Sequence, residues 1–354
     1  MRQYIIGIQQ IGVGIPDVKK AWEFYRKHFG MDIPIFQESA EAKLMTPYTG
    51  GKVQSRSAVL AINLQGGGGL EIWQYTSRKT EAPAFEIQLG DFGIFISRIK
   101  CKNVAETYRY FKSQSMDVMG NLKKDPLGKE YFFVRDSFGN IFQIVEGKDW
   151  FRKEKHLTGG VCGAQIGVSD INKSLAFYSN LLGYDNILYD KTGVFEDFSD
   201  LPGGKHTVRR VLLSKNVENT GNFSRLLGSS QLELIQVMDR KQHKIFENRY
   251  WGDLGFIHLC FDVRNMQELE KALKEKGYPF TVDSASSFDM GEAAGRFSYV
   301  EDPDGTLIEF VETHKIPILK KIGWYLHVSK RDASKPLPNW MLHALSLTRV
   351  KNKV

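Results

Sequence analysis

The sequence predicts an α+β protein built from four modules, each made of one strand, one helix and three further strands. The main observation is an internal repeat, in which segment 11–32 recurs at 166–185 and Asp17 matches Asp170, 153 residues later. Each copy has a strand, an aspartate that can cap a helix, and then apolar residues at helical spacing. A chain of 354 residues that is 42% hydrophobic is also long and apolar enough for a sizeable core.

The first module spans residues 1–76. Its first strand ends before Asp17, and the helix that follows has Val18, Ala21 and Trp22 on one face and ends at Gly30. The module closes with the strand LEIWQ around Glu71. The same order of signals predicts the remaining modules.

Modules at 88–148, 160–238 and 252–314 open their helices at Asn103, Asp170 and Asn265 and close with the strands FQIVE, LELIQ and IEFVE. The two halves of the repeat predict two domains, at 1–148 and 160–314. Residues 315–354 form a basic extension, which we expect to pack on the body.

Composition excludes several classes of protein. The net charge of +7 owes much to residues 315–354, which carry nine basic residues and one acidic residue, so the body is near neutral and no nucleic-acid partner is expected. No apolar stretch approaches the roughly 20 residues of a membrane span, and no signal peptide is recognisable. Cys101, Cys162 and Cys260 are too few for a disulfide scaffold or a cysteine zinc site, and they fit a cytoplasmic protein.

The four modules, with a DPDGTLIEF turn before the last strand, resemble the vicinal oxygen chelate superfamily. This superfamily includes glyoxalase I, methylmalonyl-CoA epimerase, extradiol dioxygenases and bleomycin-resistance proteins, and the resemblance covers residues 1–314. It implies that the modules pair into two cupped-sheet barrels, the glyoxalase/bleomycin-resistance/dioxygenase fold. It also implies a metal held by the first and last strands of paired modules.

The resemblance places a first-strand ligand seven residues before each helix cap and a second ligand at the glutamate position of each last strand. In chain order these positions are Gln10 and Glu71, Ile96 and Gln143, Gly163 and Glu233, and His258 and Glu309. Pairing of neighbouring modules would leave both sets incomplete. Pairing of the outer modules gives one full set, Gln10, Glu71, His258 and Glu309, and we predict this pairing. If the third and fourth modules paired instead, Glu233 would replace Glu71.

The residues themselves support part of this set. In IHLCFDV, apolar residues alternate with His258, Cys260 and Asp262, so His258 faces the polar side of its strand. Glu309 lies between two apolar residues of a core strand, which is costly unless its carboxylate is paired or bound to a metal. Glu309 is a candidate general base and Tyr299 a candidate proton donor.

Two groups of cationic residues are also candidates. Arg296 lies near Tyr299 in sequence and could reach the same site. Arg209 and Arg210 lie on a predicted strand of the third module, where they either meet an anionic substrate or face solvent.

These ligand types suit a divalent ion such as Zn, Ni, Co, Mn or Fe(II). We therefore predict a glyoxalase- or epimerase-like isomerase or lyase, acting on a small substrate that chelates the metal through adjacent oxygens. An Fe(II) extradiol dioxygenase is one alternative, although Gln10 stands where that group usually has histidine. A metal-free, drug-sequestering binding protein is the other. The expected partner is a small molecule, and a homodimer is left open.

Overall fold

The computed structural model describes residues 4–285, 288–289, 294–319, 323–328 and 332–351. The first module contains β1 (Ile5–Gly14), α1 (Val18–Phe29), β2 (Ile33–Glu41), η2 (Lys43–Tyr48), β3 (Ser55–Ile62) and β4 (Gly69–Tyr75). The second contains β5 (Gly93–Cys101), α2 (Val104–Ser113), β6 (Asp117–Lys124), β7 (Glu130–Arg135) and β8 (Ile141–Glu146).

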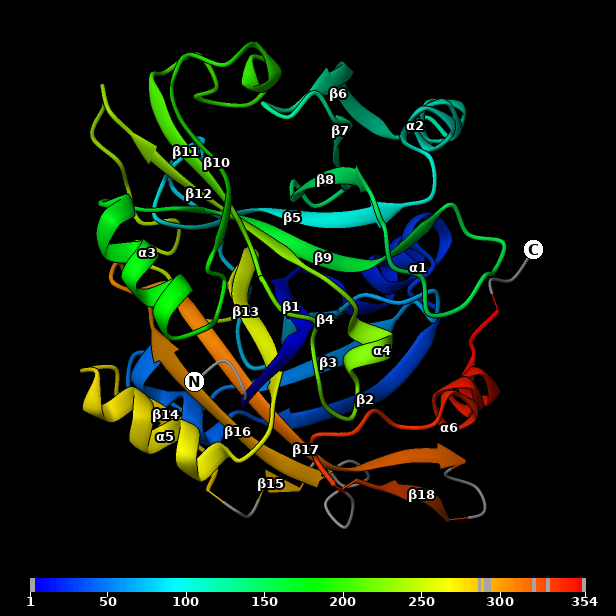
Figure 1. Cartoon of the computed structure of the whole chain (residues 1–354). Coiled ribbons are helices and arrows are strands. Elements are labelled where there is room, and N and C mark those ends of the chain that lie inside the picture. Colours follow the sequence, from blue (N-terminus) through cyan, green and yellow to red (C-terminus); the bar gives the residue numbers. More distant parts are fainter. Residues whose placement is uncertain (1–3, 286–287, 290–293, 320–322, 329–331, 352–354) are drawn as a thin grey trace.

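The second half repeats this order (Figure 1). The third module contains β9 (Thr158–Gly167), α3 (Ile171–Asn180), β10 (Asn186–Gly193), η3 (Glu196–Phe198), β11 (Val208–Ser214), α4 (Ser224–Leu227) and β12 (Gln231–Val237). The fourth contains β13 (Gly255–Val263), α5 (Met266–Glu275), β14 (Val282–Asp283), β15 (Phe288–Asp289), β16 (Ala294–Glu301) and β17 (Leu307–Leu319). The extension adds β18 (Trp324–His327), α6 (Asn339–His343) and η5 (Ala344–Thr348).

The strands form two curved sheets, each built from two modules. The outer sheet has the order β14-β16-β17-β13-β1-β4-β3-β2, with β15 also paired to β16 and β18 to β17, and it joins the first module to the fourth. The inner sheet has the order β10-β11-β12-β9-β5-β8-β7-β6 and joins the second to the third. The predicted fold and outer pairing are confirmed. The halves 1–148 and 160–314 each give one module to each sheet, so neither half closes a sheet of its own.

Each module has one helix after its first strand, and three of these four helices begin at the predicted cap with the expected side-chain hydrogen bond. The carboxylate of Asp17 accepts the backbone N–H groups of Lys19 and Lys20, and Asp170 does the same in the repeat. Asn103 accepts the N–H of Glu106 at 2.8 Å. Asn265 differs, because its backbone is left-handed, with φ of 55°, and its side chain makes no cap hydrogen bond.

Two tyrosines tie the sheets together across the shared core. Tyr25 of α1 donates to Asp136, in the turn before β8, and Tyr178 of α3 donates to Asp302, in the turn before β17. Each of these helices thus contacts a turn of the module that follows it in the chain, and that following module belongs to the other sheet. The main apolar core lies between the sheets and draws residues from all four modules.

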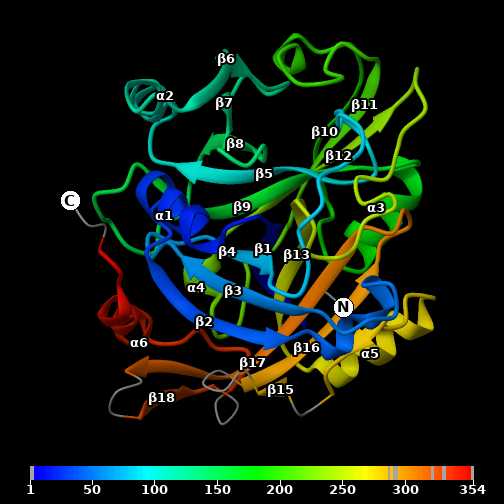
Figure 2. The same ribbon diagram turned by 180° about the vertical axis from the view of Figure 1, so that it is seen from behind.

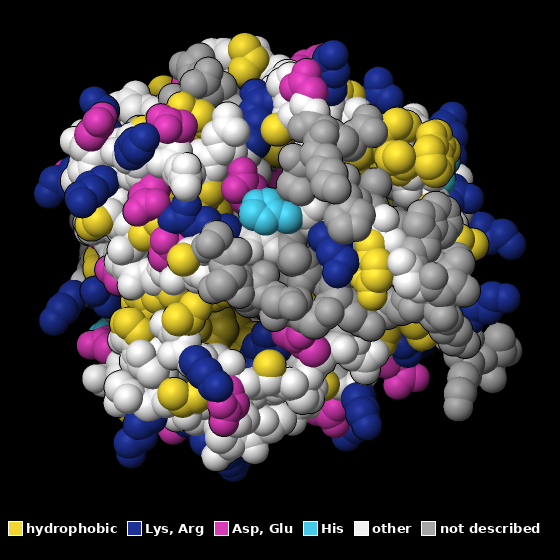
Figure 3. All heavy atoms as spheres, turned by 90° about the horizontal axis from the view of Figure 1, so that it is seen from below, with side chains coloured by type: hydrophobic (Ala, Val, Ile, Leu, Met, Phe, Trp, Pro, Cys, Tyr) yellow, Lys and Arg dark blue, Asp and Glu magenta, His cyan; other side chains and the backbone are white. Residues whose placement is uncertain are grey.

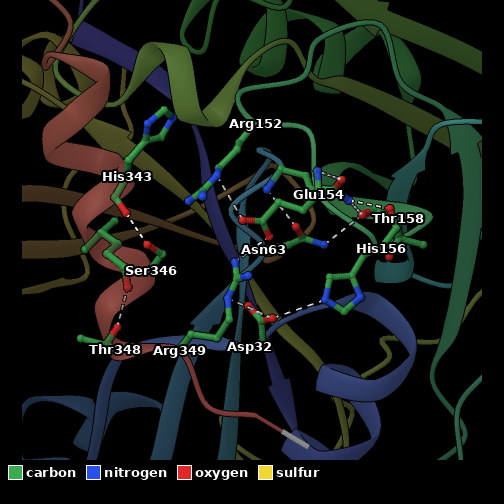
Figure 4. Close-up of polar contacts among 12 residues, drawn as sticks. Asp32, Asn63, Arg152, Glu154, His156, Thr158, His343, Ser346, Thr348 and Arg349 are labelled. Carbon is green, nitrogen blue, oxygen red and sulfur yellow. Dashed lines mark hydrogen bonds and ion pairs between the residues drawn. The ribbon is translucent and has the colours of Figure 1, made fainter.

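The C-terminal extension packs beside β2 and α4 (Figure 2). Its Leu337, Leu342 and Leu345 are buried against apolar side chains of the body. Figure 4 shows the polar end of this contact, where the guanidinium of Arg349 lies between Asp32 and Glu154. Residues 320–322, 329–331 and 352–354 of the extension lie outside the described part of the chain.

Basic and acidic side chains are mixed around the face seen in Figure 3, and hydrophobic side chains line a hollow in it. Among the described residues, no helix is long and apolar enough to cross a membrane.

Candidate metal centre

Four adjacent strands in the middle of the outer sheet bring together the predicted ligands Gln10, Glu71, His258 and Glu309. In the parallel pair β1 and β4, Glu71 lies beside Gly12, two residues beyond Gln10. In the parallel pair β13 and β17, Glu309 lies beside Cys260, two residues beyond His258. Because β1 and β13 run antiparallel, the two pairs are related by a pseudo-twofold axis, and their side chains converge on the same face.

The polar atoms of these side chains are close enough to share one small ion. His258 Nε2 lies 3.2 Å from Glu71 Oε2 and 3.1 Å from Glu309 Oε2. The amide Nε2 of Gln10 donates to the same two oxygens, at 3.2 and 3.4 Å. The ligand atoms of the two glutamates and the histidine all lie within 4.8 Å of one another, and all four residues are buried.

Gly12 makes room for the imidazole. A Cβ at this position would lie 2.5 Å from His258 Cε1 and 2.7 Å from its Nε2. Any larger residue would therefore displace the ring from the two carboxylates. Sequence reasoning missed Gly12, and the available signal was its position two residues after Gln10, on the same face of β1.

The charge of the centre depends on the histidine. Burial acts to lower the pKa of His258, but the carboxylates of Glu309 and Glu71 outweigh it and raise the pKa to about 10. The imidazolium thus offsets part of the charge of two buried carboxylates. A divalent cation would offset more of it, with the histidine neutral.

The donor set fits a metal. His258 Nε2 lies within ion-pair distance of both carboxylates, and Gln10 Oε1 is buried without a hydrogen-bond partner among the described residues. Buried polar atoms are rarely left in this state. Imidazole, carboxylate and amide donors that converge in this way suit Zn, Ni, Co, Mn or Fe(II).

Tyr299 of β16 lies at the centre, with its hydroxyl 3.3 Å from His258 Nδ1. Burial, and then the charge of Glu309, raise the pKa of this phenol, so it stays protonated. Arg296 does not reach the centre. Its guanidinium binds Asp283 and Glu270 on the other face of the sheet.

Aromatic rings fill the cup of the outer sheet around the centre. Trp251 lies on segment 245–254, here called the strap, and its ring stacks on His258 at a centroid distance of 6.4 Å. The same ring packs edge-on against Trp73 at 4.7 Å, and the hydroxyl of Tyr75 donates to the backbone oxygen of Trp251. The strap therefore covers the histidine side of the centre. Sequence reasoning missed it because a linker gives no sign of where it docks.

The equivalent place in the inner sheet holds a guanidinium. Arg210 is fully buried, contrary to the expectation that it meets substrate or solvent, and it binds Glu233 at 2.8 Å and Asp197 at 2.7 Å. Tyr189 and Gln165 also donate to Glu233. Burial acts to raise the pKa of Glu233, but Arg210 lowers it below its usual value. Ile96 and Gly163, the predicted first-strand positions, have no ligating side chain.

Two family models match the chain. Both describe the Glyoxalase/Bleomycin resistance protein/Dioxygenase superfamily, and they cover residues 7–144 and 164–299. The chain belongs to this superfamily.

Similar proteins include both kinds of enzyme that the sequence analysis considered. The "Probable lactoylglutathione lyase" of Synechocystis is 28% identical over 148 residues, which is 42% of this chain and 91% of that protein. Glyoxalase I from Zea mays superposes with a TM-score of 0.53 at 14% identity, over 86% of this chain and 92% of that one. A putative dioxygenase from Bacillus subtilis gives 0.54 at 15% identity, over 87% and 85%. At these identities the two structures establish only the shared fold.

Proposed function

We propose that the chain is a divalent-metal-dependent enzyme whose metal is held by Glu71, His258 and Glu309, with Gln10 as fourth ligand. The observation that carries this proposal is the convergence of His258 Nε2 on the two carboxylates, at 3.1 Å from Glu309 and 3.2 Å from Glu71. When bound, the metal would supply Lewis-acid activation of substrate oxygens.

The favoured reaction is a glyoxalase- or epimerase-like isomerisation or lyase step on a small substrate with two adjacent oxygens. In this proposal the carboxylate of Glu309 is the general base, which accepts the proton from the substrate carbon next to the carbonyl and returns it to the product. Tyr299 holds the ring of His258 through Nδ1, and Trp251 excludes water from that side of the centre. The similarity to a protein named as a probable lactoylglutathione lyase supports this type of chemistry.

One observation favours a second candidate, a ring-cleaving dioxygenase. Trp73, Tyr75, Trp251 and Tyr299 form one buried aromatic cluster beside the centre, and aromatic side chains of this kind would favour a flat aromatic substrate.

The first experiment is elemental analysis of protein purified without chelator or affinity metal. We expect one equivalent of metal in the wild type and in His206→Ala, whose histidine pairs with Asp239 at the surface, and none in His258→Ala. Zinc, nickel, cobalt or manganese would direct activity assays to α-hydroxycarbonyl substrates, whereas iron would direct them to oxygen uptake with catechols. A wild type without metal even after reconstitution, or metal retained in His258→Ala, would contradict the proposal.

A further inference from the structure

A cavity of about 320 Å³ lies away from the metal centre, where the chain crosses between the sheets. Two linkers make these crossings: 76–92 leads from β4 to β5, and 238–254 leads from β12 to β13. They run side by side, since Phe92 donates to His243 O, Ile245 to Phe92 O and Leu254 to Glu81 O (Figure 2). The cavity lies beneath both linkers.

The lining is mostly apolar and comes from both sheets. Phe85 and Ile87 belong to the first linker, and Ile245 and Leu254 belong to the strap. Phe95 of β5, Phe138 of the β7–β8 turn and Phe256 of β13 add aromatic rings to the lining. The volume lies at the small end of the range for ligand sites, about 300–1,000 Å³, and such sites are typically apolar with a few polar groups.

One cationic side chain of the lining, that of Arg135, makes only long polar contacts within the described part of the chain. The guanidinium of Arg135 has two polar contacts among the described residues: Nε lies 3.8 Å from Asp117 Oδ2, and one terminal nitrogen lies 3.9 Å from the sulfur of Met119. Both are long, so the planar donor fork remains available to a carboxylate. The other charged residue of the lining, Glu86, is exposed at the rim.

We propose that this cavity is a second small-molecule site, which binds an amphipathic carboxylate. The ring or branched chain of the ligand lies among the apolar side chains, and its carboxylate binds Arg135. None of the four proposed metal ligands lines this cavity.

The test is calorimetric titration of the full-length protein with 2-naphthoate, and with 2-naphthamide as its uncharged counterpart. We expect one molecule of naphthoate per chain, bound several times more tightly than the amide. Arg135→Gln should weaken naphthoate binding about fivefold, the scale of one partly exposed ion pair, and leave amide binding unchanged. Glu86→Gln should strengthen naphthoate binding, and Arg109→Gln, at an exposed position of α2, should change nothing.

Two variants locate the bound probe. Leu254→Trp and Ile87→Trp enter the cavity from different linkers, and each should abolish binding of both compounds while the protein keeps its cooperative thermal unfolding. Absence of binding at millimolar concentration would overturn the proposal, and so would binding that survives both filling variants. Equal affinity for the amide and the carboxylate would overturn the assignment of an anionic ligand.

Discussion

Glu71 and Glu233 occupy equivalent positions of the repeat but have opposite surroundings. Glu71 faces an imidazole and a second carboxylate, so its site gains from an added cation. Glu233 already binds the guanidinium of Arg210, which takes the place of such a cation. The two positions therefore form a matched pair for testing which cup holds a metal.

Replacing Glu71 by glutamine should remove the metal, whereas Glu233→Gln should keep it. The loss of affinity in Glu71→Gln should exceed the roughly 10–100-fold that loss of an outer-sphere partner costs, because a direct ligand and its charge both disappear. Elemental analysis and competition with a chelator measure both variants. Metal that follows Glu233 rather than Glu71 would contradict the assignment.

Arg210→Met should destabilise the protein by about 3–5 kcal/mol, because it leaves the carboxylates of Glu233 and Asp197 buried without their cation. Its neighbour Arg209 provides the control. It pairs with Asp190 at the surface, and Arg209→Met should cost no more than about 1 kcal/mol. Urea unfolding of the two variants compares them directly, and similar losses in both would show that the buried pair contributes nothing special.

The contact between Tyr178 and Asp302 predicts a dependence of stability on pH. Burial raises the pKa of Asp302 from 3.8 to about 6, although hydrogen bonds from Thr306 and Tyr178 act in the opposite direction. A carboxyl whose pKa is raised in the folded state stabilises the fold below its unfolded pKa, and this contribution is lost as pH rises through the folded value.

When the pH rises from about 4 to about 7, the free energy of unfolding should therefore change by different amounts in the wild type and in Asp302→Asn. In the wild type it should fall by on the order of 2 kcal/mol more than in Asp302→Asn. Denaturant unfolding across this range checks the difference. An identical pH profile in both proteins would show that Asp302 titrates normally.

At the scale of elements, the sequence predicted helix starts correctly where the capping side chain binds backbone groups close to it in the chain. Asp17 and Asn103 cap their helices with side chains only two or three residues away from the groups they bind. Asn265 fails because its left-handed backbone turns the side chain from the helix. The environment of Arg210 was not predictable, because its partners come from η3 and β12 and only the folded sheet brings them together.

We expect the strap to control access to the centre. Because Trp251 stacks on His258 and packs against Trp73, Trp251→Ala should open the cup. We expect a chelator to remove the metal severalfold faster from this variant. Trp340→Ala, which alters an exposed tryptophan of α6, serves as the control, and equal rates in both variants would show that the strap does not limit access.

At the scale of the whole molecule, the pairing of modules could be inferred from which positions kept ligand side chains. Ile96 and Gly163 cannot bind a metal, so only the outer modules offered a full set, and the structure has this arrangement. The predicted division into domains at 1–148 and 160–314 was based on the internal repeat. It reflects the order of the modules along the chain, whereas Tyr25 and Tyr178 show that successive modules meet across the two sheets.

The union of the first and last modules has a consequence for synthesis on the ribosome. The inner sheet has all its strands once residue 237 has emerged, but β1 must wait for β13, which begins at residue 255. Until then one edge of the first module is an unpaired, apolar strand, a state that favours association with other chains. The cup of the outer sheet is therefore assembled after the inner sheet, and a nascent chain that stops before residue 309 lacks one of the three side chains that converge in it.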